Sequence, residues 1–240
     1  MAPPIVNATV QSAILAATSN LLAQALSAYR NDVSLVIDWV PVVQFVFYAI
    51  ISTPPNFMWQ DFLESSFPAY HMSPTKAAVA SAAANDEKAL EQEEREGQLV
   101  EPKLNIANTL AKTVLDQTLG AFGNTYMFSL YIHSVQAAMD RPLGTPLSTP
   151  DTSAMYLASL LFGLAGPAAA KRVQYGNVSW DAVVRTSQAE FWSIVKAGWR
   201  LWPAVSIINF AFIKSIEGRN LVGGLAGVVW GIYMSLRAAS

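Results

Sequence analysis

The chain has no cysteine and few charged residues, and both shortages narrow the classes of protein to which it can belong. Without cysteine there are no disulfides, thiolate nucleophiles or cysteine-bound metals. Only 13% of the 240 residues are charged, well below the roughly 25% of an average soluble domain. Hydrophobic residues make up 52% of the chain. This composition indicates an integral membrane protein.

Catalytic motifs are also missing from the sequence. The two histidines, His71 and His133, are far apart, and neither lies in a pattern of nearby carboxylate and nucleophile. No phosphate-binding glycine loop and no metal-ligand spacing occurs. We therefore expect no enzymatic activity, no metal and no cofactor, and each histidine is interpreted as a surface or satisfied core residue.

Acidic residues are concentrated in one polar stretch. Seven of the 17 acids lie between Asp86 and Glu101. We interpret residues 64–103 as an acidic extramembrane loop, with a solvated helix over 82–95, inserted in a single membrane domain of residues 1–240. Since the chain has no basic tract, no nucleic-acid partner is expected.

Apolar stretches long enough for membrane helices fill most of the remaining chain. A helix that crosses the bilayer needs about 20 mainly apolar residues. We predict an all-α integral membrane bundle with about four transmembrane helices and additional amphipathic or interfacial helices. The apolar stretches are 7–28, 33–62, 104–139, 199–213 and 221–236.

Three other features of the sequence affect how the helices of this bundle are arranged. Pro41 and the pair Pro54-Pro55 predict kinks or a break in the second stretch. Residues 140–152 form a linker, and the apolar segment 153–170 is compatible with a spanning, a re-entrant or an interfacial helix. Residues 179–196 predict an amphipathic helix at the membrane surface, with Val183, Val184, Phe191, Ile194 and Val195 opposite Arg185 and Glu190.

Polar residues within apolar stretches are the candidate functional residues. A charge in hydrocarbon costs at least about 2.5 kcal/mol, so it must be paired or solvated inside the bundle. Lys112 is the expected partner of Asp116, four residues along the same helix face. Two interpretations remain open, a buried polar clasp between helices or the lining of a hydrophilic pathway. The residues concerned are Lys112, Asp116, Gln117 and Asn209.

Aromatic residues, single charges and glycines mark helix ends and helix contacts. Trp and Tyr favour the headgroup level of a bilayer. Interfacial anchors are expected at Asp38, Trp39, Trp199, Trp202, Arg219, Trp230 and Tyr233. Glycines at spacing four leave a groove for a neighbouring helix, which predicts a packing face at Gly223, Gly227, Gly231 and Ser235.

Several short motifs, in order along the chain, resemble those of the Mpv-seventeen/peroxisomal membrane protein family. The resemblance covers most of the chain outside the acidic loop and the region before Ser179. Each motif is weak alone, and their order and spacing carry the identification. The motifs are Asn20-Leu-Leu-Ala-Gln24, Asp38-Trp39, Thr53-Pro54, Phe57-Met-Trp59, Lys112-Thr-Val-Leu-Asp116-Gln117, Trp199 with Trp202-Pro203, Asn209-Phe210, Arg219, and Trp230 with Tyr233 and Ser235.

The resemblance implies a small multi-pass protein of an organelle membrane. The family is described as passing small solutes, so a channel-like or permeability protein is the first hypothesis. A non-transporting scaffold or tether is the alternative, with partner proteins or a second copy bound through the acidic loop or the glycine face. The lack of an arginine-rich N-terminal pattern favours the peroxisomal membrane, with the mitochondrial inner membrane as the alternative.

Overall fold

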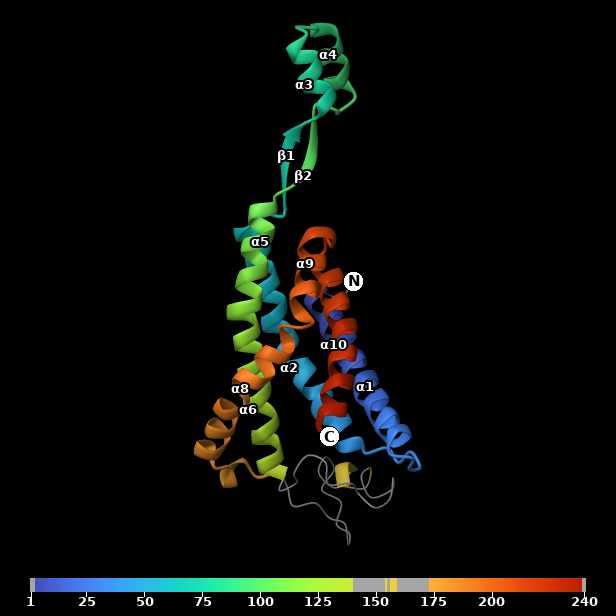
Figure 1. The fold of residues 1–240 in the computed structure, drawn as a ribbon, viewed down its shortest axis with the longest axis vertical. Coiled ribbons are helices and arrows are strands. Elements are labelled where there is room, and N and C mark those ends of the chain that lie inside the picture. Colours follow the sequence, from blue (N-terminus) through green and yellow to red (C-terminus); the bar gives the residue numbers. More distant parts are fainter. Residues whose placement is uncertain (1–2, 140–153, 155, 159–172, 239–240) are drawn as a thin grey trace.

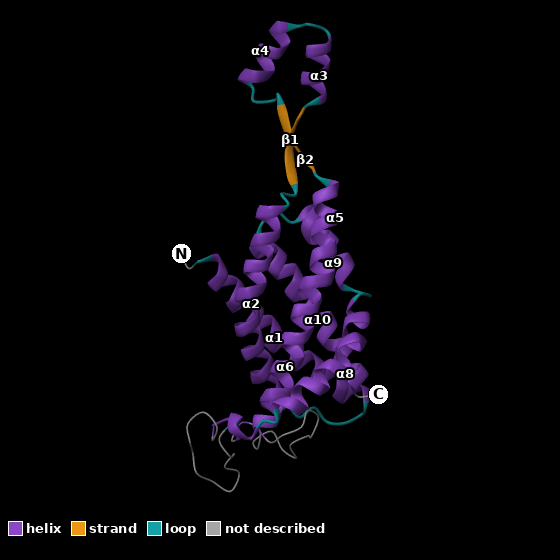
Figure 2. Ribbon diagram, turned by 90° about the vertical axis from the view of Figure 1, so that its left-hand side faces the viewer, coloured by secondary structure: helices purple, strands orange, loops and turns teal. Residues whose placement is uncertain are grey.

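The structure is a tall helical body from which a thin two-stranded stalk projects, with a small helical cap at its far end (Figure 1). A view turned by 90° shows the same separation of body, stalk and cap (Figure 2). This computed structural model describes residues 3–139, 154, 156–158 and 173–238. The helical body confirms the all-α bundle, and one short antiparallel hairpin is the exception. The predicted linker at 140–152 lies outside the described residues, as does most of the segment 153–170.

Helices α1 (Pro4–Arg30) and α10 (Ile216–Ala238) pack against each other along one edge of the body. Proline fits the first turn of α1 because the amides there have no partner within the helix. Small residues on the facing sides allow the close approach, which is a common solution in membrane bundles. The opposite face of α1 exposes hydrophobic side chains, among them Val6, Val10 and Ile14.

Helix α2 (Trp39–Ser66) starts at an N-cap, since the Asp38 side chain accepts a 3.0 Å hydrogen bond from the backbone N–H of Val40. The helix continues through Pro54 and Pro55, so of the predicted kinks or break, the break does not occur. Prolines are tolerated inside membrane helices because neighbouring groups satisfy the backbone, and no water competes for it.

Helix α5 (Ile106–Leu115), the π-helical turn η1 (Asp116–Gly120) and α6 (Ala121–Met139) follow one another without a gap. They form one continuous rod over the predicted apolar stretch 104–139. The wide π turn lies near the middle of this rod, which is where its most polar residues occur.

Helix α8 (Trp180–Gly198) follows a short 3-10 turn, η2 (Tyr175–Asn177), and packs against α6. It buries Val183 and Val195, as the predicted amphipathic pattern requires. Helix α9 (Trp202–Phe212) has 11 residues, about 16 Å of helix, and is too short to cross roughly 30 Å of hydrocarbon by itself. The stretch 199–213 is therefore not a complete span.

The stalk consists of β1 (Tyr70–Pro74) and β2 (Val100–Leu104), which pair antiparallel with Tyr70 opposite Leu104 and Pro74 opposite Val100. Glu101 and Lys103 lie in β2, so the predicted polar loop 64–103 begins in the last residues of α2 and ends in a folded ladder. The stalk holds the cap away from the apolar body (Figure 1).

The cap consists of α3 (Lys76–Ala83) and α4 (Glu87–Arg95). The predicted helix over 82–95 is interrupted at Asn85, whose φ of 52° lies in the left-handed region. Asparagine tolerates that conformation, and the Asp86 side chain then caps α4 at the N–H of Ala89. The acidic stretch is thus a helical hairpin.

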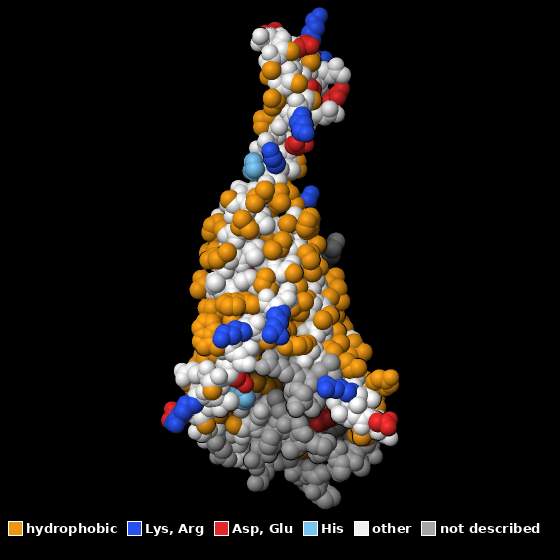
Figure 3. Space-filling model, in the orientation of Figure 1, with side chains coloured by type: hydrophobic (Ala, Val, Ile, Leu, Met, Phe, Trp, Pro, Cys, Tyr) orange, Lys and Arg blue, Asp and Glu red, His pale blue; other side chains and the backbone are white. Residues whose placement is uncertain are grey.

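Hydrophobic side chains cover the flanks of the body, while charged ones gather on the stalk and cap and near the opposite end (Figure 3). Among the described residues, α1 is the helix that is long and apolar enough to cross a membrane by length and composition. Polar residues and prolines dilute the apolar character of α2. This criterion therefore supports one of the roughly four predicted spans.

Candidate functional site

Glu64, near the end of α2, is the centre of a buried ion-pair cluster. Its Oε2 atom lies 2.7 Å from Lys112 Nζ and 2.6 Å from Arg219 Nη2. Its Oε1 atom accepts a 2.9 Å hydrogen bond from the backbone N–H of Ala69, at the foot of the stalk. The side chains of Lys112 and Arg219 are 0% and 1% exposed, so this carboxylate is their main charge partner. Glu64 therefore joins α2, α5, α10 and the stalk.

The ring of Phe210 in α9 completes this cluster. Lys112 Nζ lies 5.0 Å and Arg219 Cζ 5.4 Å from the ring centroid. The face of an aromatic ring attracts cations, more strongly where water is excluded, and Phe210 is buried. Two cations thus share one carboxylate and one ring.

In this arrangement Lys112 and Asp116 do not form the ion pair expected from the sequence. Lys112 reaches Glu64 on α2, whereas Asp116 starts the π turn and bonds elsewhere. The order of lysine before aspartate at spacing four is the less favourable one on a helix, and a carboxylate on a neighbouring helix replaces it.

Asp116 lies where α2, η1 and α9 meet, and its carboxylate accepts four hydrogen bonds. Trp59 Nε1 and Gln60 Nε2 donate to Oδ1 at 3.3 and 3.2 Å. Gln117 Nε2 and Ser206 Oγ donate to Oδ2 at 3.2 and 2.9 Å. All four donors are neutral, and within the described residues no cation forms an ion pair with this carboxylate.

Unpaired oxygens accompany this carboxylate. The side-chain oxygens of Gln60 and Gln117 are buried and have no hydrogen-bond partner. Buried polar atoms without a protein partner are commonly satisfied by water. Asp116, Gln60, Gln117 and Ser206 therefore form an acceptor-rich polar site inside an apolar body.

The π turn makes room for this site. Single π turns in α-helices occur frequently at functional positions. A Cβ atom at Gly120 would lie 2.8 Å from Trp59 Nε1, so glycine is needed for the indole to reach Asp116. Trp199 donates from Nε1 to the backbone carbonyl of Gln117 at 3.0 Å. This bond ties the junction of α8 and α9 to the π turn.

Asn209 and Arg219 lie together inside the body. Asn209 Nδ2 donates to the carbonyl of Arg219 at 3.2 Å, and Arg219 Nε donates to the carbonyl of Ile213 at 2.9 Å. The expectation that Arg219 is an interfacial anchor is corrected, because its side chain is buried against Glu64. Asn209 closes the turn between α9 and α10 instead of contacting Asp116.

His133 has a carboxylate partner that its sequence neighbourhood does not show. Its Nε2 atom lies 2.9 Å from Glu190 Oε1, and Ser129 Oγ donates to the same oxygen. Glu190 therefore faces α6, whereas the sequence places it on the polar face of the amphipathic helix. Within the described part of the chain, no three His, Asp or Glu side chains converge on a possible metal site.

Comparison with known proteins bears on the segment that contains α8, α9 and α10. Residues 176–235 match the model of the Mpv17 / PMP22 family. PXMP2/4 family protein 3 of Dictyostelium discoideum is 48% identical over 44 residues, which are 18% of this chain and 23% of that protein. Protein SYM1 of Yarrowia lipolytica is 27% identical over 60 residues, 25% of this chain and 29% of that protein.

Over residues 176–235 the chain is similar to the Mpv17 / PMP22 family. This match confirms, for that segment, the resemblance seen in the motifs. The aligned segments span only about a quarter of the relatives' length, 23% and 29%. No solved structure matches the chain.

The motifs that resemble the Mpv17 / PMP22 family meet in pairs in the structure. Gln24 exchanges two hydrogen bonds with the backbone of Asp38, at 2.7 and 2.8 Å. Asp38 and Trp39, expected as interfacial anchors, lie at the start of α2, and Gln24 fixes this start to α1.

The aromatic residues at the end of the Mpv17 / PMP22 region also contact one another. The rings of Trp202 and Trp230 meet edge to face, with centroids 6.4 Å apart. Trp230 also stacks on Tyr233 at 5.5 Å. These three residues, expected at headgroup level, therefore hold α9 to α10, and Tyr233 keeps an exposed edge.

The glycine face of α10 is only partly the predicted one. A Cβ atom at Gly224 would meet Leu15 of α1 at 2.5 Å, and one at Gly231 would clash with Ser19. A Cβ at Gly223 or Gly227 would meet nothing within 4 Å. The contact with α1 therefore uses Gly224 and Gly231, and the side chain of Ser235 lies outside the described residues.

Two acids that shape the interior are missing from the sequence-based candidates. Glu64 stands at the border between an apolar and a polar stretch, where a solvated loop is the simpler interpretation. Glu190 lies among polar residues of an amphipathic helix. A lysine in an apolar stretch requires a charge partner. For Lys112 the signal in the sequence is Glu64, the acid that follows the preceding apolar stretch.

Proposed function

We propose that the protein is a permeability protein for small solutes in an organelle membrane, and that the pathway passes the polar site at Asp116. The observation that supports this proposal is a carboxylate held by four neutral donors from three segments of the body. The buried oxygens of Gln60 and Gln117 next to it provide unused acceptors for water.

Two of the four candidate lining residues fit this role, and two do not. Asp116 and Gln117 belong to the acceptor-rich site. Lys112 and Asn209 belong to the cluster around Glu64, where the carboxylate pairs with both Lys112 and Arg219, although Asn209 Oδ1 and Arg219 Nη1 are buried there without a hydrogen-bond partner. We assign the clasp role to that cluster and the pathway role to the Asp116 site.

Flux through liposomes tests the proposal. Purified protein in liposomes is expected to release small solutes, and Asp116→Asn is expected to change the preference between positively and negatively charged solutes. Glu101→Gln, on the exposed stalk, is the matched control and should keep the preference of the wild type. Release no faster than from empty liposomes would overturn the proposal.

We propose the peroxisomal membrane as the location, with the mitochondrial inner membrane as the alternative. The resemblance to the Mpv17 / PMP22 family supports both. Imaging of a tagged copy against markers of the two organelles decides between them, and a mitochondrial pattern overturns the preference.

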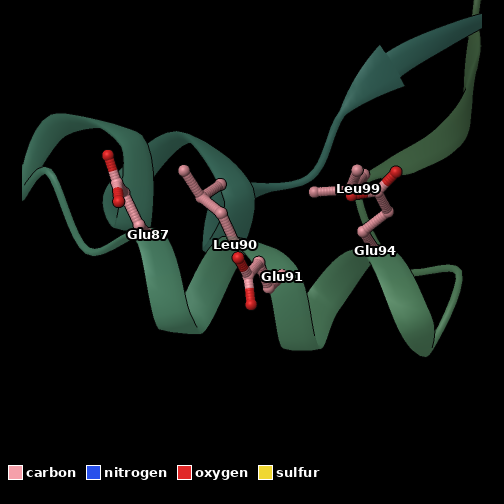
Figure 4. Close-up of a pocket in the computed structure, with 5 residues that line it drawn as sticks. All are labelled: Glu87, Leu90, Glu91, Glu94 and Leu99. Atoms are coloured by element: carbon pink, nitrogen blue, oxygen red, sulfur yellow. The ribbon is translucent and has the colours of Figure 1, made fainter.

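A scaffold or tether is the second candidate function, and the cap favours it. The cap stands apart from the body on its stalk (Figure 1). Glu87, Glu91 and Glu94 project from one side of α4 around a shallow hollow that Leu90 and Leu99 also line (Figure 4). An acidic rim with apolar contacts suits a basic, partly apolar partner segment.

Removal of the cap separates the two functions. Residues 75–99 can be replaced by Asn-Gly, a two-residue turn that closes antiparallel strands. The shortened protein should keep solute release if the permeability proposal holds, and should lose any partner recovered by crosslinking if the cap is a tether. Loss of solute release with a normal unfolding profile would favour a role of the cap in permeation.

We propose that the protein is not an enzyme. Ser129 and His133 bond the same oxygen of Glu190, so the histidine is not placed to take the serine proton as a general base would be.

A further inference from the structure

The outward face at the end of α8 combines exposed aromatic and basic side chains. Trp192, Lys196 and Arg200 follow one another at spacing four, with Trp199 beside them, and all four are exposed. Trp192 and Lys196, four apart in α8, lie on the same side of the helix, and Arg200 lies in the turn that follows its last residue, Gly198. Basic side chains stand among hydrophobic ones on the flank of the body near this junction of α8 and α9 (Figure 3).

These cations have no anion in the described part of the chain. Lys196 and Arg200 form no ion pair there. The nearest acid in α8, Glu190, bonds inward to His133, and no acid follows until Glu217. Asp116, the acid of the adjoining π turn, is occupied by its four donors. The face therefore carries net positive charge.

The aromatic residues hold this face in a fixed shape. Trp199 is tied through Nε1 to the carbonyl of Gln117. The ring of Phe122 in α6 contacts Trp192 and Trp199, with centroids 5.6 and 6.4 Å apart. The two exposed indoles are thus positioned by the body and flank the two cations.

We infer that this face binds the phosphate headgroup of an anionic phospholipid. Unpaired cations on an apolar flank require anions from the surroundings, and the flank of a membrane protein faces lipid. Tryptophan prefers the headgroup level, and basic side chains there attract anionic lipids. Lys196 and Arg200 contact the phosphate, while Trp192 and Trp199 pack beside the glycerol and upper acyl chain. The inference rests on the resemblance to a membrane-protein family and not on solute permeation.

The test uses the full-length protein in vesicles of phosphatidylcholine with phosphatidylglycerol. One of the two lipids carries brominated acyl chains, which quench tryptophan fluorescence on contact. The wild type is expected to be quenched more strongly by brominated phosphatidylglycerol than by brominated phosphatidylcholine at equal content. Each cation removed, by Lys196→Gln or Arg200→Gln, should lower this preference roughly fivefold, the equivalent of about 1 kcal/mol per cation.

Controls separate charge from folding and lipid from free phosphate. The double variant Lys196→Arg with Arg200→Lys keeps the charge of the face and should keep the lipid preference. The double variant Lys88→Gln with Arg95→Gln removes two cations from the cap and should also keep the preference. An unchanged preference in the double glutamine variant overturns the inference. The inference is also overturned if inorganic phosphate abolishes the preference and chloride of equal ionic strength does not. The face would then bind a soluble anion.

Discussion

The ammonium of Lys112 lies 2.7 Å from Glu64 Oε2, on the neighbouring helix, and not beside the carboxylate of Asp116 on its own helix. This pairing divides the polar interior into two parts. One is an ion-pair cluster that joins helices to the foot of the stalk, and the other is a neutral-donor site around Asp116. The two parts lead to different expected effects of substitution.

Glu64→Gln is expected to destabilise the protein strongly. The substitution leaves the buried charges of Lys112 and Arg219 without their carboxylate, and such a loss costs about 3–5 kcal/mol. Unfolding by denaturant in detergent micelles measures the effect. Glu101→Gln on the exposed stalk should stay within about 0.5 kcal/mol of the wild type, and equal stability of the two variants would contradict the role of Glu64.

A pair of double-mutant cycles distinguishes the partners of Lys112. Residues in one ion-pair network couple by about 0.5–3 kcal/mol. Lys112→Met with Glu64→Gln should show coupling at the upper end of that range, and Lys112→Met with Asp116→Asn much less. Stronger coupling to Asp116, measured by the same unfolding assay, would restore the pair expected from the sequence.

Trp199→Phe is expected to loosen the junction of α8 and α9. Phenylalanine keeps a ring beside Phe122 but cannot donate to the carbonyl of Gln117, and the loss of one hydrogen bond costs about 0.5–1.5 kcal/mol. Trp192→Phe is the matched control, since its indole forms no hydrogen bond with any residue that the structure describes. Protection of the 116–120 amides from hydrogen exchange should fall in the first variant only.

Alanine substitutions in α10 should separate the packed glycines from the open ones. Gly224→Ala places a methyl group against Leu15, and overpacking of this kind costs about 1–3 kcal/mol. Gly223→Ala meets nothing within 4 Å and should be neutral or slightly stabilising. A larger loss of stability from Gly223→Ala in the monomeric protein would indicate that the contact with α1 is wrong.

Local sequence patterns were sufficient to predict the helices whose formation depends on residues close to one another in the chain. The amphipathic face of α8 and the apolar rod over 104–139 follow from hydrophobic periodicity and segment length. The order of the motifs was sufficient for the resemblance to the Mpv17 / PMP22 family, which the comparison supports over residues 176–235. The break expected at Pro54-Pro55 does not occur because the surrounding body, which the sequence does not display, leaves the backbone no better partner.

The sequence alone thus determined the helical architecture and the resemblance to the Mpv17 / PMP22 family, because composition and spacing express what each helix must bury. Only the tertiary structure decided which polar residues meet. Glu64 and Lys112 are 48 residues apart, and Asp116 and Ser206 are 90 apart. Such pairs depend on how helices are placed around one another, and a buried charge bonds the partner that packing brings within reach, which no local pattern encodes.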